Sequence, residues 1–135
     1  MSPRFDVIPK RKRINIFKIG KLWVLKQFFE DKALYTALLG NYNKDRYRFE
    51  FKSTGSRNNA LKLLERSGFD YDLVEDLRGY VVQLPKSSKY AQILKNSVSM
   101  KETATDRLFV MKDLAAVEDA LSSGASIYEV ETSFE

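Results

Sequence analysis

The alternation of apolar and charged positions predicts a β-strand near the middle of the chain. Tyr47, Phe49 and Phe51 occupy every second position, which is the period of a strand with one buried side. We expect this aromatic side to face the core. The opposite side is charged and is expected to face solvent; it consists of Arg48, Glu50 and Lys52.

The segments that follow this strand predict a mixed α+β domain. A helix is expected over residues 60–68, where Gly68 is placed to end it. The remaining elements are strands over residues 71–76, 80–84 and 108–111 and a helix over residues 90–94. From residue 46 to residue 111 the order is therefore β-α-β-β-α-β, the order of a ferredoxin-like fold.

The N-terminal part adds a short strand over residues 14–17 and then a helical extension. From about Lys21, apolar residues recur at helical spacing, namely Leu22, Leu25, Phe28 and Phe29. Asp31 is placed to cap a second helical segment, which Gly40 and Asn41 end.

An α-β unit completes the chain. Asp113 is expected to cap a helix that ends at Gly124, and residues 127–130 form a last strand.

Pro3, Pro9 and a run of four basic residues disfavour regular structure at the start of the chain. We therefore predict a basic, flexible arm over residues 1–13 and a single α+β domain over residues 14–135.

The composition excludes several classes of active site. The 135 residues contain no histidine and no cysteine, so Ser-His-Asp and Cys-His catalytic arrangements and His/Cys metal sites are impossible. We predict no catalytic residue, no cofactor and no metal. The lack of cysteine fits a reducing cytoplasm, and no apolar run is long enough to span a bilayer.

Charge is distributed unevenly along the chain. Residues 1–55 hold 13 Lys/Arg and 5 Asp/Glu, a net charge of +8, whereas residues 113–135 hold six acids and no base. The two ends of the chain could neutralise each other in the fold. They could instead leave a basic face for an anionic partner.

The basic, aromatic-rich front is the first candidate binding region. A polybasic arm suits an anionic polymer, a protein partner or a membrane surface, although many such runs are only solvated tails. The residues expected to bind a protein partner, or a second copy of the chain, are Arg4, Lys10, Arg11, Lys12, Arg13, Lys18, Lys21, Trp23, Phe28 and Phe29.

Nucleic-acid binding is the alternative. Arg78-Gly79-Tyr80 resembles the first three positions of the central signature of an RNA-recognition motif. The later positions depart from it, because Val81, Val82 and Leu84 offer no stacking ring. The residues expected to serve this alternative are Arg46, Arg48, Lys52, Arg78 and Tyr80.

Two shorter motifs have a functional and a simpler interpretation. The stretch from Ser53 to Asn59 could bind an anion at a helix start through Thr54, Gly55, Ser56 and Arg57; the simpler interpretation is a helix N-cap. Four acids could hold Mg²⁺ or Ca²⁺ or could simply be solvated; they are Asp70, Asp72, Glu75 and Asp76.

These observations favour a non-enzymatic interaction module, such as a small accessory or regulatory protein of a larger assembly. The basis is the lack of any strong catalytic signature together with the basic, aromatic front. Nucleic-acid binding through the arm and the charged strand face remains open. A small enzyme that acts on a phosphorylated ligand is the third possibility.

Overall fold

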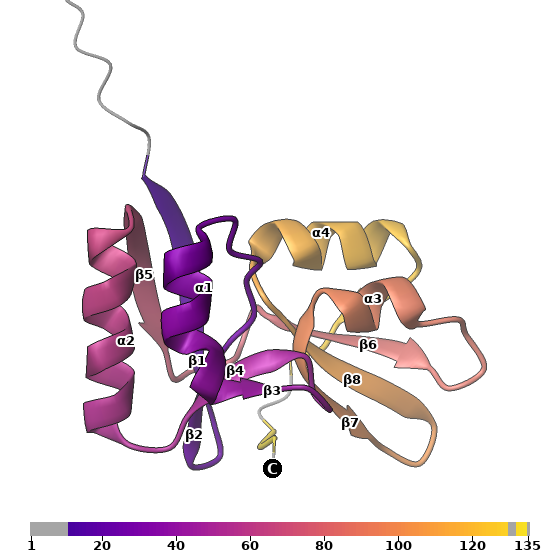
Figure 1. Cartoon of the computed structure of the whole chain (residues 1–135). Coiled ribbons are helices and arrows are strands. Elements are labelled where there is room, and N and C mark those ends of the chain that lie inside the picture. Colours follow the sequence, from indigo (N-terminus) through magenta and orange to yellow (C-terminus); the bar gives the residue numbers. More distant parts are fainter. Residues whose placement is uncertain (1–10, 130–131, 135) are drawn as a thin grey trace, which may run out of the picture.

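The computed structural model describes residues 11–129 and 132–134, and it has two β-sheets, each covered by its own helices (Figure 1). The first sheet has the strand order β3-β4-β2-β1-β5. Its strands are β1 Lys12–Ile19, β2 Leu22–Leu25, β3 Tyr42–Asn43, β4 Arg48–Phe51 and β5 Phe69–Val74. β1 and β5 are parallel, and the other neighbours are antiparallel. Two helices pack on one face, α1 Lys32–Leu38 and α2 Thr54–Arg66, with a 3₁₀ turn at Leu39–Asn41.

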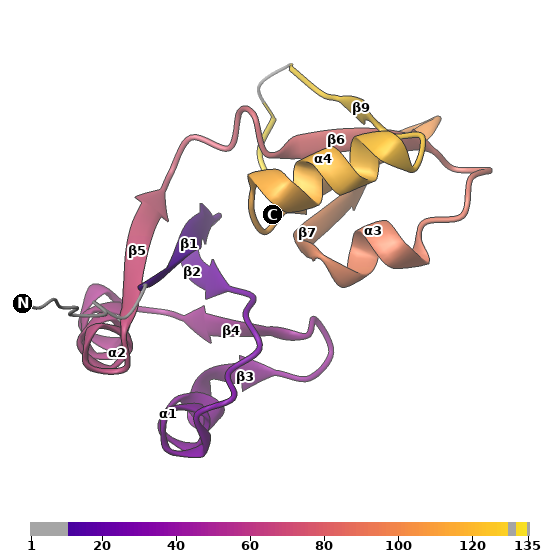
Figure 2. The same ribbon diagram turned by 90° about the horizontal axis from the view of Figure 1, so that it is seen from above.

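The second sheet is antiparallel and has the order β7-β8-β6-β9. Its strands are β6 Val81–Pro85, β7 Ser97–Glu102, β8 Asp106–Met111 and β9 Ser126–Ile127. Helices α3 Ala91–Lys95 and α4 Leu114–Ser122 cover one face of it. Figure 2 shows the two halves side by side, connected by the stretch between β5 and β6.

Each half has its own apolar core, and a third apolar cluster joins the halves. On β1, Ile14 and Ile16 point toward the helices of the first half, whereas Phe17 and Ile19 point toward the second sheet. This alternation buries β1 on both faces. The cluster between the sheets consists of Phe17, Ile19, Val24, Val81, Val98, Leu108, Val110 and Phe134.

The helix boundaries follow local hydrogen bonding. The Asp31 side chain accepts bonds from the backbone N–H groups of Ala33 and Leu34 at the start of α1. Asp113 does the same for Ala116 in α4. Gly68 and Gly124 follow α2 and α4 with φ of 92° and 105°, angles that favour glycine. The predicted caps at Asp31 and Asp113 and the predicted helix ends at both glycines are confirmed.

The predicted helical extension over residues 21–29 is wrong. Leu22–Leu25 is strand β2, which turns back on β1 through Gly20 and Lys21. Gly20 has φ of 60°, which the tight turn requires. The four consecutive apolar residues suit a strand that is buried on both faces, and helical spacing alone does not separate the two structures.

The α+β class is confirmed, but the strands do not form a ferredoxin-like sheet. β4 and β5 belong to the first sheet, whereas β6 and β8 belong to the second. Strand β7 was not predicted; it lies between α3 and β8, where the chain was expected to run directly from a helix to the strand over residues 108–111. The predicted element types are therefore largely present, while the single central sheet is not.

Candidate binding groove between the two sheets

A groove opens along one side of the junction between the two halves. It holds a cavity of about 660 Å³ lined by Lys26, Asp45, Arg46, Tyr47, Arg48, Ala91, Leu94, Lys95, Ser97, Val98, Ser99 and Met100. A neighbouring cavity of about 450 Å³ shares Lys26, Tyr47 and Lys95 with the first and adds Phe28, Tyr35 and Lys112 among others. We call the two cavities together the seam groove.

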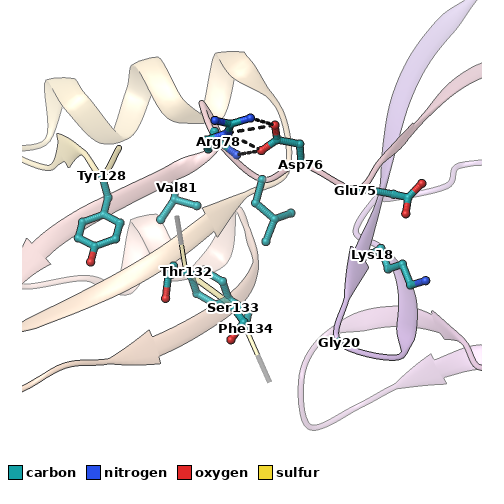
Figure 3. Close-up of a pocket in the computed structure, with 11 residues that line it drawn as sticks. Lys18, Gly20, Glu75, Asp76, Arg78, Val81, Tyr128, Thr132, Ser133 and Phe134 are labelled. Atoms are coloured by element: carbon teal, nitrogen blue, oxygen red, sulfur yellow. Dashed lines mark hydrogen bonds and ion pairs between the residues drawn. The ribbon is translucent and has the colours of Figure 1, made fainter. Parts of the chain in front are cut away.

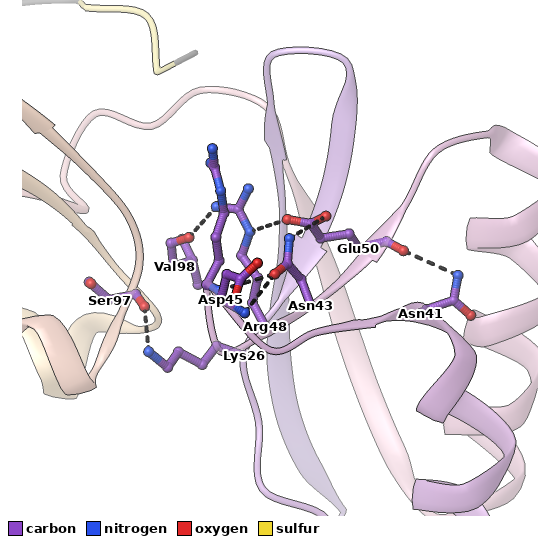
Figure 4. Close-up of polar contacts among 9 residues, drawn as sticks. Lys26, Asn41, Asn43, Asp45, Arg48, Glu50, Ser97 and Val98 are labelled. Carbon is purple, nitrogen blue, oxygen red and sulfur yellow. Dashed lines mark hydrogen bonds and ion pairs between the residues drawn. The ribbon is translucent and has the colours of Figure 1, made fainter.

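Arg48 lies in the wall of the groove and is only 1% exposed. Its Nε donates to Glu50 Oε2 at 2.7 Å, and its Nη1 donates to the Val98 carbonyl oxygen at 2.5 Å (Figure 4). Nη2 is buried and has no hydrogen-bond partner among the described residues. Arg48 therefore ties β4 to β7 and leaves its Nη2 group unused.

The prediction that Arg48 faces solvent is wrong. Arg48 contacts the second sheet through Val98, and the alternation did not reveal this burial, whereas Lys52 at the end of the same face is exposed as predicted. Phe49 and Phe51 are buried as predicted, at 2% and 0% exposure. Tyr47 is instead 65% exposed, because the strand begins one residue after it.

Glu50 balances part of the Arg48 charge. Burial alone would raise the pKa of Glu50, but hydrogen bonds from Arg48 and Asn43 and the attraction of the Arg48 charge together lower it below its usual value. The carboxylate is therefore held ionised beside the guanidinium of Arg48, and the charge of Arg46 also stabilises it.

Lys26 follows β2 and reaches across to the second half. Its Nζ donates to the carbonyl oxygen of Ser97 at 2.9 Å (Figure 4) and to that of Leu94 at 3.3 Å, both near the junction of α3 and β7. Burial lowers the pKa of Lys26 to about 8, and repulsion by Lys112 and Arg48 adds to the effect.

The rim of the groove is apolar and aromatic. Tyr47 has φ of 55°, in the left-handed region that side-chain-bearing residues rarely adopt, and its ring is largely exposed. Leu94 and Met100 are each 39% exposed. Phe28, at 80% exposure, is the most exposed of the large apolar side chains in the described part of the chain.

A third cavity, of about 600 Å³, lies apart from the seam groove, beside the connection between β5 and β6 (Figure 3). Lys18, Gly20 and Glu75 line it from the first half, and Val81, Tyr128 and Phe134 from the second. Hydrogen bonds from the Arg78 side chain and backbone lower the pKa of Asp76 to about 2. The charges in this cavity are mixed in sign, so it does not favour one charge class of ligand.

The basic residues at the end of the proposed arm are largely paired. Arg11 Nε lies 2.8 Å from Asp70 Oδ1, and Arg13 Nε lies 2.7 Å from Asp72 Oδ2, along the β1–β5 pair. Lys12 begins strand β1 and is exposed. Arg4 and Lys10 lie outside the described residues.

The other residues predicted to bind a partner do not form one surface. Trp23 and Phe29 are core residues, at 7% and 5% exposure, while Lys18 lies 5.7 Å from the centre of the Trp23 ring. Lys18 and Lys21 are exposed near the β1–β2 turn. Of the predicted aromatics, Phe28 and Phe29 line the seam groove, but Phe29 is buried and only Phe28 is exposed there.

The residues considered for nucleic-acid binding are also spread out. Arg46 and Arg48 line the seam groove, whereas Lys52 lies elsewhere on the first half. Tyr80 packs edge-on against Phe17 with ring centres 5.1 Å apart. Arg78 bonds to Asp76. The described structure therefore brings only two of the five together.

The stretch from Thr54 to Arg57 forms the first turn of α2. The Ser53 side chain caps it by accepting a bond from the Ser56 backbone N–H. Arg57 stacks over Trp23, with its guanidinium carbon 4.7 Å from the ring centre. The simpler interpretation of this motif, a helix N-cap, is confirmed.

Sequence reasoning missed most of the groove. Lys26, Tyr47, Leu94, Lys95 and Met100 come from four separate segments, and none carries a motif. The only usable indication was Tyr47, the aromatic residue at the start of the central strand, and its side chain was predicted to lie in the core.

Comparisons with protein-family models, with curated proteins and with solved structures found no match to this chain. Among residues 11–129 and 132–134, no group of three or more acidic side chains could hold a metal ion. None of the helices in the described part of the chain has the length and apolar character needed to cross a membrane.

Proposed function

We propose that this chain is a non-enzymatic interaction module that binds a protein partner in the seam groove. The observation that carries the proposal is the combination of exposed apolar side chains with a strong excess of positive charge in one concave site. Phe28, Tyr47, Leu94 and Met100 supply the apolar contacts. Exposed apolar groups gathered in a cleft are typical of binding surfaces.

The charge of the groove indicates the kind of segment it would take. Its described lining holds five cationic side chains, Lys26, Arg46, Arg48, Lys95 and Lys112, against one acid, Asp45, while Glu50 beside the groove pairs with Arg48. Complementary charge steers association and rejects partners of the wrong sign. The preferred partner segment is therefore acidic and carries apolar side chains.

A selection from displayed random peptides tests this proposal. The groove should select peptides that combine acidic and large apolar residues. Leu94→Asp and Met100→Asp each place a carboxylate on the apolar rim and should abolish binding of the selected peptides. Both variants should keep the wild-type circular dichroism spectrum, because the two side chains are exposed.

Leu114→Asp is the matched control, since Leu114 is 59% exposed on α4 and does not line the groove. It should bind the selected peptides as the wild type does. The proposal fails if no peptide is selected, or if the three variants bind equally. Tight, salt-dependent binding of single-stranded RNA that Met100→Asp disrupts would replace it with nucleic-acid binding.

A further inference from the structure

The groove holds more positive charge than the described residues around it neutralise. Glu50 is occupied by Arg48, and Asp45 is an exposed residue of the β3–β4 turn. Lys95 and Lys112 line the groove from the second half, and no described acid forms an ion pair with either of them within 4 Å.

Arg48 adds a fixed charge that water screens poorly. Its side chain is 1% exposed, and its Nη2 lacks the acceptor that a buried donor normally has. Because Nη2 is itself buried, the guanidinium acts on an oxyanion in the groove through its poorly screened charge.

Lys26 is half-buried in the same groove, with Lys112 and Arg48 as cationic neighbours. Burial and two cationic neighbours lower its pKa, so its own charged form is disfavoured where it sits. An oxyanion in the groove would oppose both neighbours and would favour the ammonium form again.

We propose that the seam groove binds one oxyanion, a carboxylate or a phosphate, carried by the partner segment, with Lys26 and Lys95 facing it and Arg48 as the buried counter-charge. This inference rests on the proposed function and specifies the chemistry of the partner segment. One acidic group of that segment supplies the negative charge that the groove binds. The apolar rim then holds the side chains on either side of that group.

Carbon-13 NMR of the lysine Cε atoms tests the inference with inorganic phosphate, acetate and chloride at equal ionic strength. The Lys26 signal is assigned by its loss in Lys26→Arg. In phosphate or acetate the pKa of Lys26 should rise above its value in chloride, because the bound anion stabilises the ammonium form. Identical Lys26 titrations in all three salts would overturn the inference.

Exposed variants separate binding from folding. Lys95→Gln should weaken phosphate binding by about threefold to tenfold, the scale of losing one partly screened charge contact. Lys89→Gln removes an exposed lysine outside the groove lining and should leave binding unchanged. Equal loss in both variants would reduce the effect to general charge attraction and contradict the site.

Two further results separate the inference from the proposed function. If the selected peptides carry apolar residues without an acidic position, the groove is a protein-binding site but not an oxyanion site. If phosphate raises the pKa of Lys26 while no peptide is selected, the oxyanion site stands and the protein partner does not. Synthetic peptides with glutamate or phosphoserine at the selected position then show which oxyanion is preferred.

Discussion

Lys26 is the residue for which burial and charge make the clearest prediction. Its folded-state pKa of about 8 lies below its ordinary value of 10.5. Between these two pH values the unfolded chain binds the proton and the folded chain does not, so stability should rise with pH across this window. Urea unfolding at pH values from 7 to 10.5 measures the trend.

Lys26→Gln isolates the contribution of this one group, since tyrosines and other lysines also titrate at high pH. Glutamine keeps a donor for the Ser97 carbonyl oxygen. The difference in stability between wild type and variant should move in favour of the wild type as the pH rises above about 8. A constant difference would show that Lys26 titrates normally.

Arg48 makes the second prediction at this scale. Arg48→Met should lower the free energy of unfolding by about 3 kcal/mol, because it leaves the Glu50 carboxylate in the seam without its cation. Arg48→Met combined with Glu50→Gln should lose less than Arg48→Met alone, since the remaining partner is then neutral. Urea denaturation of both variants measures this, and a larger loss in the double variant would contradict it.

The same residue shows why the site could be predicted only in part. Alternation correctly placed Phe49 and Phe51 in the core. It also placed Arg48 in solvent, because a charged side chain on the outer face of a strand normally lies there. Arg48 is buried where it reaches Val98 of β7, a strand far from β4 in the chain.

Among the elements, the turn that joins β3 to β4 holds a strained residue. Tyr47 has φ of 55°, and a side chain there costs about 1 kcal/mol relative to glycine. Tyr47→Gly should therefore be more stable than Tyr47→Ala by about that amount, because both variants lose the ring and only alanine keeps the strain. Thermal unfolding of the pair measures the difference; equal stability would show that the turn is relaxed.

Helices were easier to predict than strands, for a local reason. Asp31, Ser53 and Asp113 each satisfy backbone N–H groups within three residues of themselves, so a short stretch of sequence contains the whole signal. Strand β2 has no such signal. Its identity depends on pairing with β1 and β4 on either side.

For the whole molecule, the cluster between the sheets determines whether the halves act as one unit. Phe134 is 2% exposed and belongs to this cluster. Phe134→Ala should lower the free energy of unfolding by about 3 kcal/mol, the usual range for a buried aromatic. Urea unfolding followed by tryptophan fluorescence and by circular dichroism should shift together for both signals.

Leu114→Ala is the control for this prediction, because it removes a similar apolar volume from an exposed position. It should change stability by less than about 0.5 kcal/mol. If the two signals are already separated in the wild type, the halves unfold independently and the cluster does not couple them.

The arrangement of the sheets could not be predicted from the same alternation. The pattern in β1 shows that both of its faces are apolar, but it does not show which elements cover each face. Residues 14–19 contact α1 and α2 on one side and β6 and β8 on the other. The prediction of a single sheet is therefore wrong, although most of the strands predicted for it are present.

The parallel pairing of β1 with β5 has a consequence for the order of folding. Lys12 pairs with Phe69 and Phe17 with Val74, so β1 is made long before its partner on that edge. On a ribosome, β1 can form its hairpin with β2 at once, but one side of it stays open until β5 emerges. Closing this long loop is the entropically costly step. The acidic partners of Arg11 and Arg13 belong to β5. Until β5 has been synthesised, the two arginines keep the open edge of β1 charged, which discourages this edge from pairing with other chains.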